Sequence, residues 1–174
     1  DIGTGKPSIC RTLLNLLDSH PSVETALIFH TAITEVEILE AVVKEFGIEI
    51  PRETGTKKAY VDALNGFLLK NFAAGKNAVL LIDEAQNLSY GVLEQIRMLS
   101  NLETEKEKLL QIILIGQPEI KTMLTLPALR QLNERITVRY DLKPLSADEV
   151  IAYIEHRLLV AGGPGKIKFT KGAY

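Results

Sequence analysis

The chain alternates short, continuously apolar runs with longer segments in which apolar residues recur every three or four positions. The continuous runs at 78–82 and 110–115 show no polar alternation, which is typical of strands buried on both faces of a parallel sheet. The segments 35–46 and 57–72 have helical periodicity instead. An alternation of such strands and helices predicts an α/β fold.

The remaining segments continue this alternation. We predict further helices over residues 9–17, 93–99, 120–124 and 128–133. We predict further strands over residues 25–29 and 136–140. Ser146 and Glu149 then have the spacing of a capping box, which predicts a helix from there to about residue 161. Phe169 and Thr170 indicate the beginning of another helix. We interpret the stretch from residue 144 on as the start of a second, helical subdomain.

Composition narrows the class of protein. The 174 residues are 46% hydrophobic and 24% charged, which is typical of a globular protein with one substantial core. The net charge of -2 is spread along the chain, so the sequence gives no support for nucleic acid as a partner. The single cysteine, Cys10, excludes an internal disulfide, so a reducing, cytoplasmic compartment fits best. The histidines lack the spacing of metal ligands. The apolar runs are too short to cross a bilayer.

The chain begins with a glycine-rich stretch that matches the end of the phosphate-binding pattern G-x-x-x-x-G-K-[ST]. The matching residues are Gly3, Thr4, Gly5 and Lys6. In this pattern the backbone N–H groups face phosphate oxygens and the lysine reaches the outer phosphates. Taken alone, so short a string is equally compatible with an ordinary turn that leads into a helix.

Pro7 occupies the position at which the pattern has serine or threonine. Proline removes the hydroxyl that would ligate magnesium and also one backbone N–H group. It disfavours a helical conformation at Lys6, although proline itself is tolerated in a first helical turn. Ser8 follows and could contact the α-phosphate. We therefore expect hydrolysis to be weakened more than nucleotide binding.

Two acids follow the apolar run 78–82, at the end of a strand where α/β sheets bind ligands. This is the Walker B arrangement, in which Asp83 holds Mg²⁺ and Glu84 polarises the attacking water. Because side chains alternate along a strand, we expect the two carboxylates to point to opposite sides. On its own the pair is also compatible with the polar boundary of a core strand. The upstream phosphate-binding stretch favours a site for ATP and Mg²⁺.

Three further side chains are candidates for the same site. Gln117 follows the run 110–115 and is either a sensor of the γ-phosphate or a turn residue that bonds its own backbone. Arg130 and Arg135 precede the predicted strand 136–140. Either arginine can serve as a finger that reaches the nucleotide of a neighbouring subunit, although surface arginines commonly have no such role.

Several strings together resemble the general secretion pathway protein A (ExeA) family, over essentially the whole chain. They are Gly-Thr-Gly-Lys at 3–6, Val-Leu-Leu-Ile-Asp-Glu-Ala-Gln-Asn-Leu at 79–88, Ile-Gly-Gln-Pro-Glu at 115–119, Leu-Arg-Gln-Leu at 129–132, Glu-Arg-Ile at 134–136, Tyr-Ile-Glu-His-Arg-Leu at 153–158 and Ala-Gly at 161–162. The resemblance implies an AAA+ ATPase, a P-loop NTPase with a parallel sheet flanked by helices. It also implies a cytoplasmic domain of a bacterial inner-membrane protein that serves assembly of the type II secretion channel.

The resemblance implies partners and domain limits as well. The partners are ATP, further copies of the chain in an oligomer, a protein of the secretion machinery, and a membrane reached through segments outside this chain. Residues 1–143 correspond to the nucleotide-binding core without its first strand and residues 144–174 to the start of a helical lid, so we expect truncation at both ends. Two alternatives stay open: a DNA transposition helper ATPase, and a nucleotide-binding scaffold with hydrolysis impaired by Pro7. The retained Asp83 and Glu84 argue against the scaffold.

Overall fold

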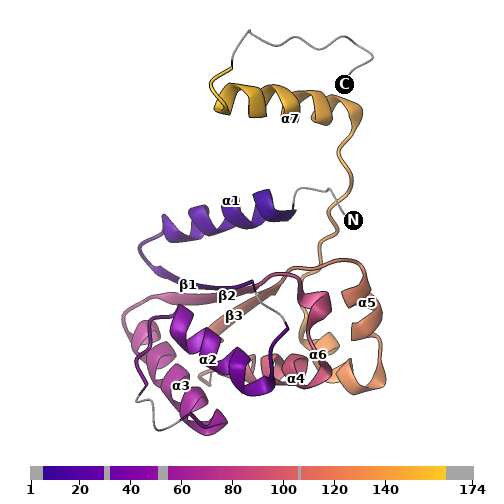
Figure 1. Cartoon of the computed structure of the whole chain (residues 1–174). Helices are drawn as coiled ribbons and strands as arrows, with labels where there is room; N and C mark the ends of the chain where they lie inside the picture. Colours follow the sequence, from indigo (N-terminus) through magenta and orange to yellow (C-terminus); the bar gives the residue numbers. More distant parts are fainter. Residues whose placement is uncertain (1–5, 30–31, 51–54, 106, 164–174) are drawn as a thin grey trace. The chain divides into compact units, whose positions relative to one another are not determined.

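The computed structural model describes residues 6–29, 32–50, 55–105 and 107–163, without the side chains of Lys6 and Pro7. These residues fall into two compact units (Figure 1). The larger unit comprises Pro7–Arg139, and the smaller one includes the described residues from Tyr140 onward.

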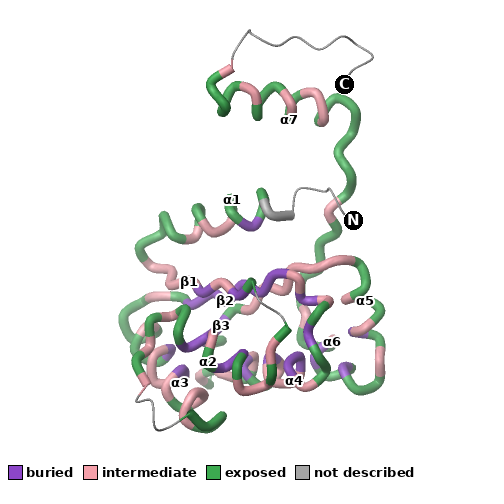
Figure 2. Tube along the Cα trace, viewed as in Figure 1, coloured by how far each residue is buried: buried purple, intermediate pink, exposed green. Residues whose placement is uncertain are grey.

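The larger unit is built on a sheet of three parallel strands in the order β1-β2-β3. The strands are β1 (Val23–Ile28), β2 (Asn77–Ile82) and β3 (Leu110–Leu114). Ile82 is level with Ile28 on one side and with Leu114 on the other, so the three carboxyl ends meet at one edge. Every residue of β2 after Asn77 is buried, which confirms the strand predicted from its unbroken apolar run (Figure 2).

Helices cover both faces of this sheet, with α1 on one face and α2, α3 and α4 on the other (Figure 1). The bounds of the helical elements in the larger unit are α1 (Lys6–Asp18), α2 (Glu35–Glu45), α3 (Lys57–Ala73), η2 (Ala85–Asn87), α4 (Tyr90–Leu99), α5 (Glu119–Leu124), η3 (Pro127–Leu129) and α6 (Arg130–Arg135). These bounds confirm the helices predicted from the apolar periodicity.

The starts and ends of the long helices follow local chemistry. The side chains of Thr34, Thr56 and Ser89 each accept a hydrogen bond from a backbone N–H in the first turn of α2, α3 and α4. Beyond the ends of α2 and α3 stand Gly47 and Gly75, with φ values of 67° and 71°. Glycine adopts this left-handed conformation without the steric cost that other residues incur.

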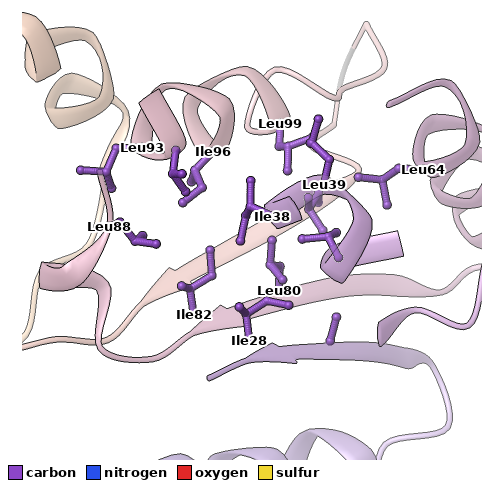
Figure 3. Packing of buried hydrophobic residues seen from close by; sticks show 14 of the residues in the cluster. Ile28, Ile38, Leu39, Leu64, Leu80, Ile82, Leu88, Leu93, Ile96 and Leu99 are labelled. Atoms are coloured by element: carbon purple, nitrogen blue, oxygen red, sulfur yellow. The ribbon is translucent and has the colours of Figure 1, made fainter. Parts of the chain in front are cut away.

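The main core lies between β2 and the three helices α2, α3 and α4 that cover one face of the sheet (Figure 3). Leu80 and Ile82 of β2 are fully buried there. Each facing helix contributes residues spaced three or four positions apart, so that one apolar stripe meets the sheet. These residues are Ile38, Leu39 and Val42 of α2, Leu64 and Leu68 of α3, and Leu93, Ile96 and Leu99 of α4.

Pro7 lies within the first turn of α1, which begins at Lys6. The expectation that proline keeps Lys6 out of the helical region is therefore wrong. The first four N–H groups of a helix have no intrahelical partner, so the missing donor of Pro7 removes no helical hydrogen bond.

The strand predicted at 136–140 is also wrong. Ile136 has an extended backbone, but no residue of the segment joins a ladder in the described part of the chain, and Val138 and Tyr140 are 81% and 85% exposed. Alternating apolar residues favour an extended backbone, but a strand also needs a neighbour to supply its hydrogen bonds.

In the smaller unit, α7 (Ala147–Val160) begins at the predicted capping box. The Glu149 carboxylate accepts hydrogen bonds from the backbone N–H of Ser146 at 2.7 Å and from its hydroxyl at 2.8 Å, and these bonds lower the pKa of Glu149. The helix start expected at Phe169 and Thr170 lies outside the described residues. Within the described ranges, every helix is too short or too polar to cross a membrane.

Candidate functional site

Asp83 is the first residue after β2, at the edge where the three strands end. Its N–H donates to the carbonyl of Ile28 at 2.9 Å, so the backbone is still tied to β1 at this point. Its side chain is buried, and Oδ1 accepts the N–H of Glu84 at 2.8 Å. The carboxylate is thereby held at the C-terminal edge of the sheet, the position expected for a residue that binds Mg²⁺.

Glu84 has φ 51° and ψ 38°, the left-handed conformation, and is the one non-glycine residue with positive φ in the described part of the chain. The chain therefore leaves the extended conformation at this residue. Strand alternation thus ends at Glu84, and the expectation that the carboxylates of Asp83 and Glu84 point to opposite sides stays a prediction. A side chain in this conformation costs about 1–2 kcal/mol, and such strain is concentrated at functional sites.

The carboxylate of Glu84 faces two amides. Its Oε2 accepts a hydrogen bond from Nε2 of Gln86 at 2.5 Å and lies 3.5 Å from Nε2 of Gln117. The backbone N–H of Gln117 donates to Oε1 of Gln86 at 3.0 Å. The structure thus brings together Glu84 and Gln117, two residues singled out from the sequence 33 positions apart. Gln86 was missed, although it lies within the string 79–88 that carries the family resemblance.

Cys10 is a buried residue of α1 whose thiol senses the charge of this acidic edge. Its side chain is buried, and burial is the main cause of a raised pKa of its thiol. The negative charges of Asp83 and then Glu84 raise that pKa further, which places the first half of α1 near both carboxylates. The helix that follows the phosphate-binding stretch therefore runs within electrostatic range of the acidic pair.

The phosphate-binding residues themselves are only partly described. Gly3, Thr4 and Gly5 lie outside the described residues, and Lys6 and Pro7 are described only as the start of α1. Ser8 is exposed on α1, and its carbonyl oxygen accepts the hydroxyl of Thr12 at 2.9 Å. The predicted contacts of this stretch with phosphate stay predictions.

Both candidate arginines are exposed on α6. Nε of Arg130 donates to Oε1 of Glu134 at 2.9 Å, one helical turn away, with most of both side chains in solvent. Arg135 contributes to a lowered pKa of Glu103, for which Lys108 is the main cause. The choice between the two as an arginine finger stays a prediction.

The donor set fits magnesium shared with a nucleotide. In the described ranges, no group of three or more histidine, cysteine or acidic side chains could hold a metal ion. Mg²⁺ needs no such cage, because it takes one or two carboxylate oxygens and completes its shell with phosphates and water. Asp83, whose carboxylate is held at the sheet edge, is a suitable ligand of this kind.

The left-handed conformation of Glu84 predicts an inverted order of stability between two variants. Glu84→Gly and Glu84→Ala both remove the carboxylate, but only glycine relieves the backbone. We expect Glu84→Gly to be more stable than Glu84→Ala by about 1 kcal/mol in urea unfolding. The matched pair Gln95→Gly and Gln95→Ala, within α4, should show the opposite order by about 1 kcal/mol. The same order at both positions would contradict a strained backbone at Glu84.

A match to a known family identifies the class of protein. Residues 1–124 match the family described as AAA domain, and the chain belongs to that family. It is also 49% identical over 162 residues to the general secretion pathway protein A of Aeromonas hydrophila. That alignment covers 93% of this chain and 29% of the relative, so the chain spans less than a third of the relative's length.

Solved structures show the same fold. The Aeropyrum pernix ORC2 protein in its ADP form superposes with a TM-score of 0.69 at 15% identity, covering 91% of this chain and 44% of the other. Cdc6p from Pyrobaculum aerophilum gives 0.68 at 19% identity, covering 91% and 41%. Together with the family match, these likenesses confirm the predicted α/β fold of the P-loop, AAA+ type, with a parallel sheet flanked by helices.

Proposed function

We propose that this domain binds ATP together with Mg²⁺, hydrolyses it to ADP and phosphate, and couples turnover to assembly of a type II secretion channel. The observation that carries the proposal is the meeting of Glu84 and Gln117 at the sheet edge that also holds Asp83. A carboxylate and an amide on neighbouring strands form the pair needed to orient water and to contact a terminal phosphate.

The residues divide the work between binding and reaction. The backbone at Gly3, Thr4, Gly5 and Ser8 and the side chain of Lys6 bind the phosphates at the start of α1, where N–H groups and the helix dipole favour an anion. Asp83 holds magnesium, which when bound neutralises phosphate charge. Glu84 accepts a proton from the attacking water, and Gln117 contacts the γ-phosphate.

The proposed partners rest on the relative and on the exposed arginines. The 49% identity to general secretion pathway protein A supports a protein of the secretion machinery as the partner on which ATP turnover acts. Arg130 or Arg135, exposed on α6, completes the site of a neighbouring copy, so the active form is an oligomer. We place residues 1–143 in the nucleotide-binding core and 144–174 in the lid. The domain works on the cytoplasmic side of a bacterial inner membrane, which it reaches through segments outside this chain.

The test is the magnesium-dependent ATPase rate of the full-length protein over a range of protein concentrations. We expect specific activity to rise with concentration as subunits complete each other's sites. The Lys6→Ala variant should lose nucleotide binding in a titration with a fluorescent ATP analogue, because one cation that meets the phosphates is gone. A parent protein without turnover, or binding that is insensitive to Lys6→Ala, would overturn the proposal.

Pro7 favours a second candidate function, a scaffold that binds nucleotide but turns it over poorly. Proline at this position offers neither a hydroxyl for Mg²⁺ nor an N–H for phosphate. Pro7→Thr restores both groups and separates the two functions. If the parent is inactive and Pro7→Thr hydrolyses ATP, the natural protein is the scaffold; if both are active, Pro7 is tolerated and the motor stands.

A further inference from the structure

The side-chain amide of Gln86 bridges two residues of the candidate site, Glu84 and Gln117. It lies in η2, directly after the turn at Glu84. Its Nε2 donates to Oε2 of Glu84 at 2.5 Å, while its Oε1 accepts the backbone N–H of Gln117 at 3.0 Å. The two bonds assign the amide consistently, because a rotated amide would turn its nitrogen toward an N–H and its oxygen toward a carboxylate.

The backbone around this bridge leaves room for it. A Cβ atom at Gly116 would lie 2.9 Å from Oε1 of Gln86, which is closer than real Cβ contacts, but 3.4 Å from the backbone nitrogen of Gln86. An added methyl group therefore conflicts with the amide rather than with the chain. The N–H of Ala85 also donates to the carbonyl of Ile115 at 2.9 Å, which ties η2 to the end of β3. The bridge thus lies against a fixed piece of backbone.

We propose that Gln86 is a positioning residue that fixes the carboxylate of Glu84 relative to the tip of β3, so that Glu84 and Gln117 act as one unit. The proposal rests on the function proposed above. A glutamate side chain has three rotatable bonds, and an active-site group that is misplaced by about 1 Å can cost roughly 100-fold in rate. The amide of Gln86 makes a shorter contact to Oε2 than the amide of Gln117 does, and it is anchored to backbone at its other end.

A positioning role predicts a particular kinetic signature. Gln86 contacts the group that activates water, and the phosphate-binding stretch lies elsewhere in the sequence. Its loss should lower kcat roughly 10-fold to 100-fold and leave KM and the affinity for ATP almost unchanged. A residue that matters only for folding would instead lower the active fraction and the unfolding midpoint together.

Three variants of the full-length protein test this. Gln86→Leu removes both hydrogen bonds, Gln86→Glu keeps an acceptor for Gln117 but turns an oxygen toward Glu84, and Gly116→Ala displaces the amide while leaving Gln86 unchanged. We expect all three to lower kcat at constant affinity for a fluorescent ATP analogue. The matched controls are Gln95→Leu and Gln95→Glu on α4, where the amide contacts only the Met98 sulfur, at 3.9 Å, among the contacts described. They should keep the kcat of the parent.

The outcomes separate this proposal from the function on which it rests. An active parent whose Gln86→Leu and Gly116→Ala variants are equally active would overturn the positioning role alone. A parent that binds ATP without hydrolysing it would overturn both. If Gln86→Leu unfolds, as judged by circular dichroism, Gly116→Ala and Gln86→Glu decide the question. A rise in KM at unchanged kcat would assign Gln86 to binding and would also overturn the proposal.

Discussion

Glu84→Gln is expected to lower kcat for ATP hydrolysis by about 10²–10⁴-fold while ATP still binds. Glutamine has the shape of glutamate but no basic oxygen, so it cannot accept the proton of the attacking water. The carbonyl oxygen of the new amide can still accept the hydrogen bonds that Oε2 now accepts from Gln86 and Gln117, so the change removes the basic oxygen and keeps these contacts. The effect should therefore appear in the chemical step.

The measurement is steady-state hydrolysis with saturating Mg²⁺ and ATP, beside a titration with a fluorescent ATP analogue. The matched control is Glu94→Gln in α4, which makes the same chemical change at a carboxylate paired with Arg97. It should retain the kcat of the parent. If Glu84→Gln hydrolyses ATP at the rate of the parent, another group activates the water and the role proposed for Glu84 is wrong.

Leu80→Ala is expected to lower the free energy of unfolding by about 2–5 kcal/mol. Leu80 is fully buried in the middle of β2, level with Ala26 of β1 and with Ile112 of β3. It also faces the α2 residues Ile38 and Leu39 (Figure 3). Truncation removes buried apolar surface and leaves a cavity that a closely packed sheet and helix layer cannot fill.

Urea unfolding followed by circular dichroism measures this loss. Leu16→Ala on α1 is the matched control, because the same atoms are removed from a side chain that is 62% exposed. Its change should stay within about 0.5 kcal/mol. Equal effects of the two substitutions would mean that β2 is not at the centre of the core, which would contradict the sheet order.

Much of the fold could be predicted because its central strand, β2, is buried on both faces. An unbroken apolar run such as the one that became β2 marks a central strand without reference to any other segment. The prediction of a strand at 136–140 failed because a strand depends on other segments of the chain. The alternation of this segment favours an extended chain, but whether an extended chain becomes a strand depends on a neighbour, which periodicity does not report.

The candidate site was predictable to the extent that it depends on strand ends. Asp83 and Glu84 follow the buried strand β2, Gln117 follows its neighbour β3, and the register of parallel strands brings such positions together. Gln86 could not be found in this way, because its role depends on the left-handed turn at Glu84 and on the absence of a side chain at Gly116. Both are properties of three-dimensional contacts, and neither leaves a periodic signal.

The backbone conformation of Glu84 also bears on how this protein would respond to artificial selection. A library screened only for resistance to heat or protease should enrich glycine at position 84, since glycine is free of the steric cost that glutamate carries there. The survivors would be more stable proteins without the carboxylate to which we assign activation of the attacking water. Selection for stability and for ATPase activity together should instead retain Glu84 and enrich stabilising substitutions at other positions. The residue found at position 84 would therefore distinguish the two kinds of selection within a few rounds.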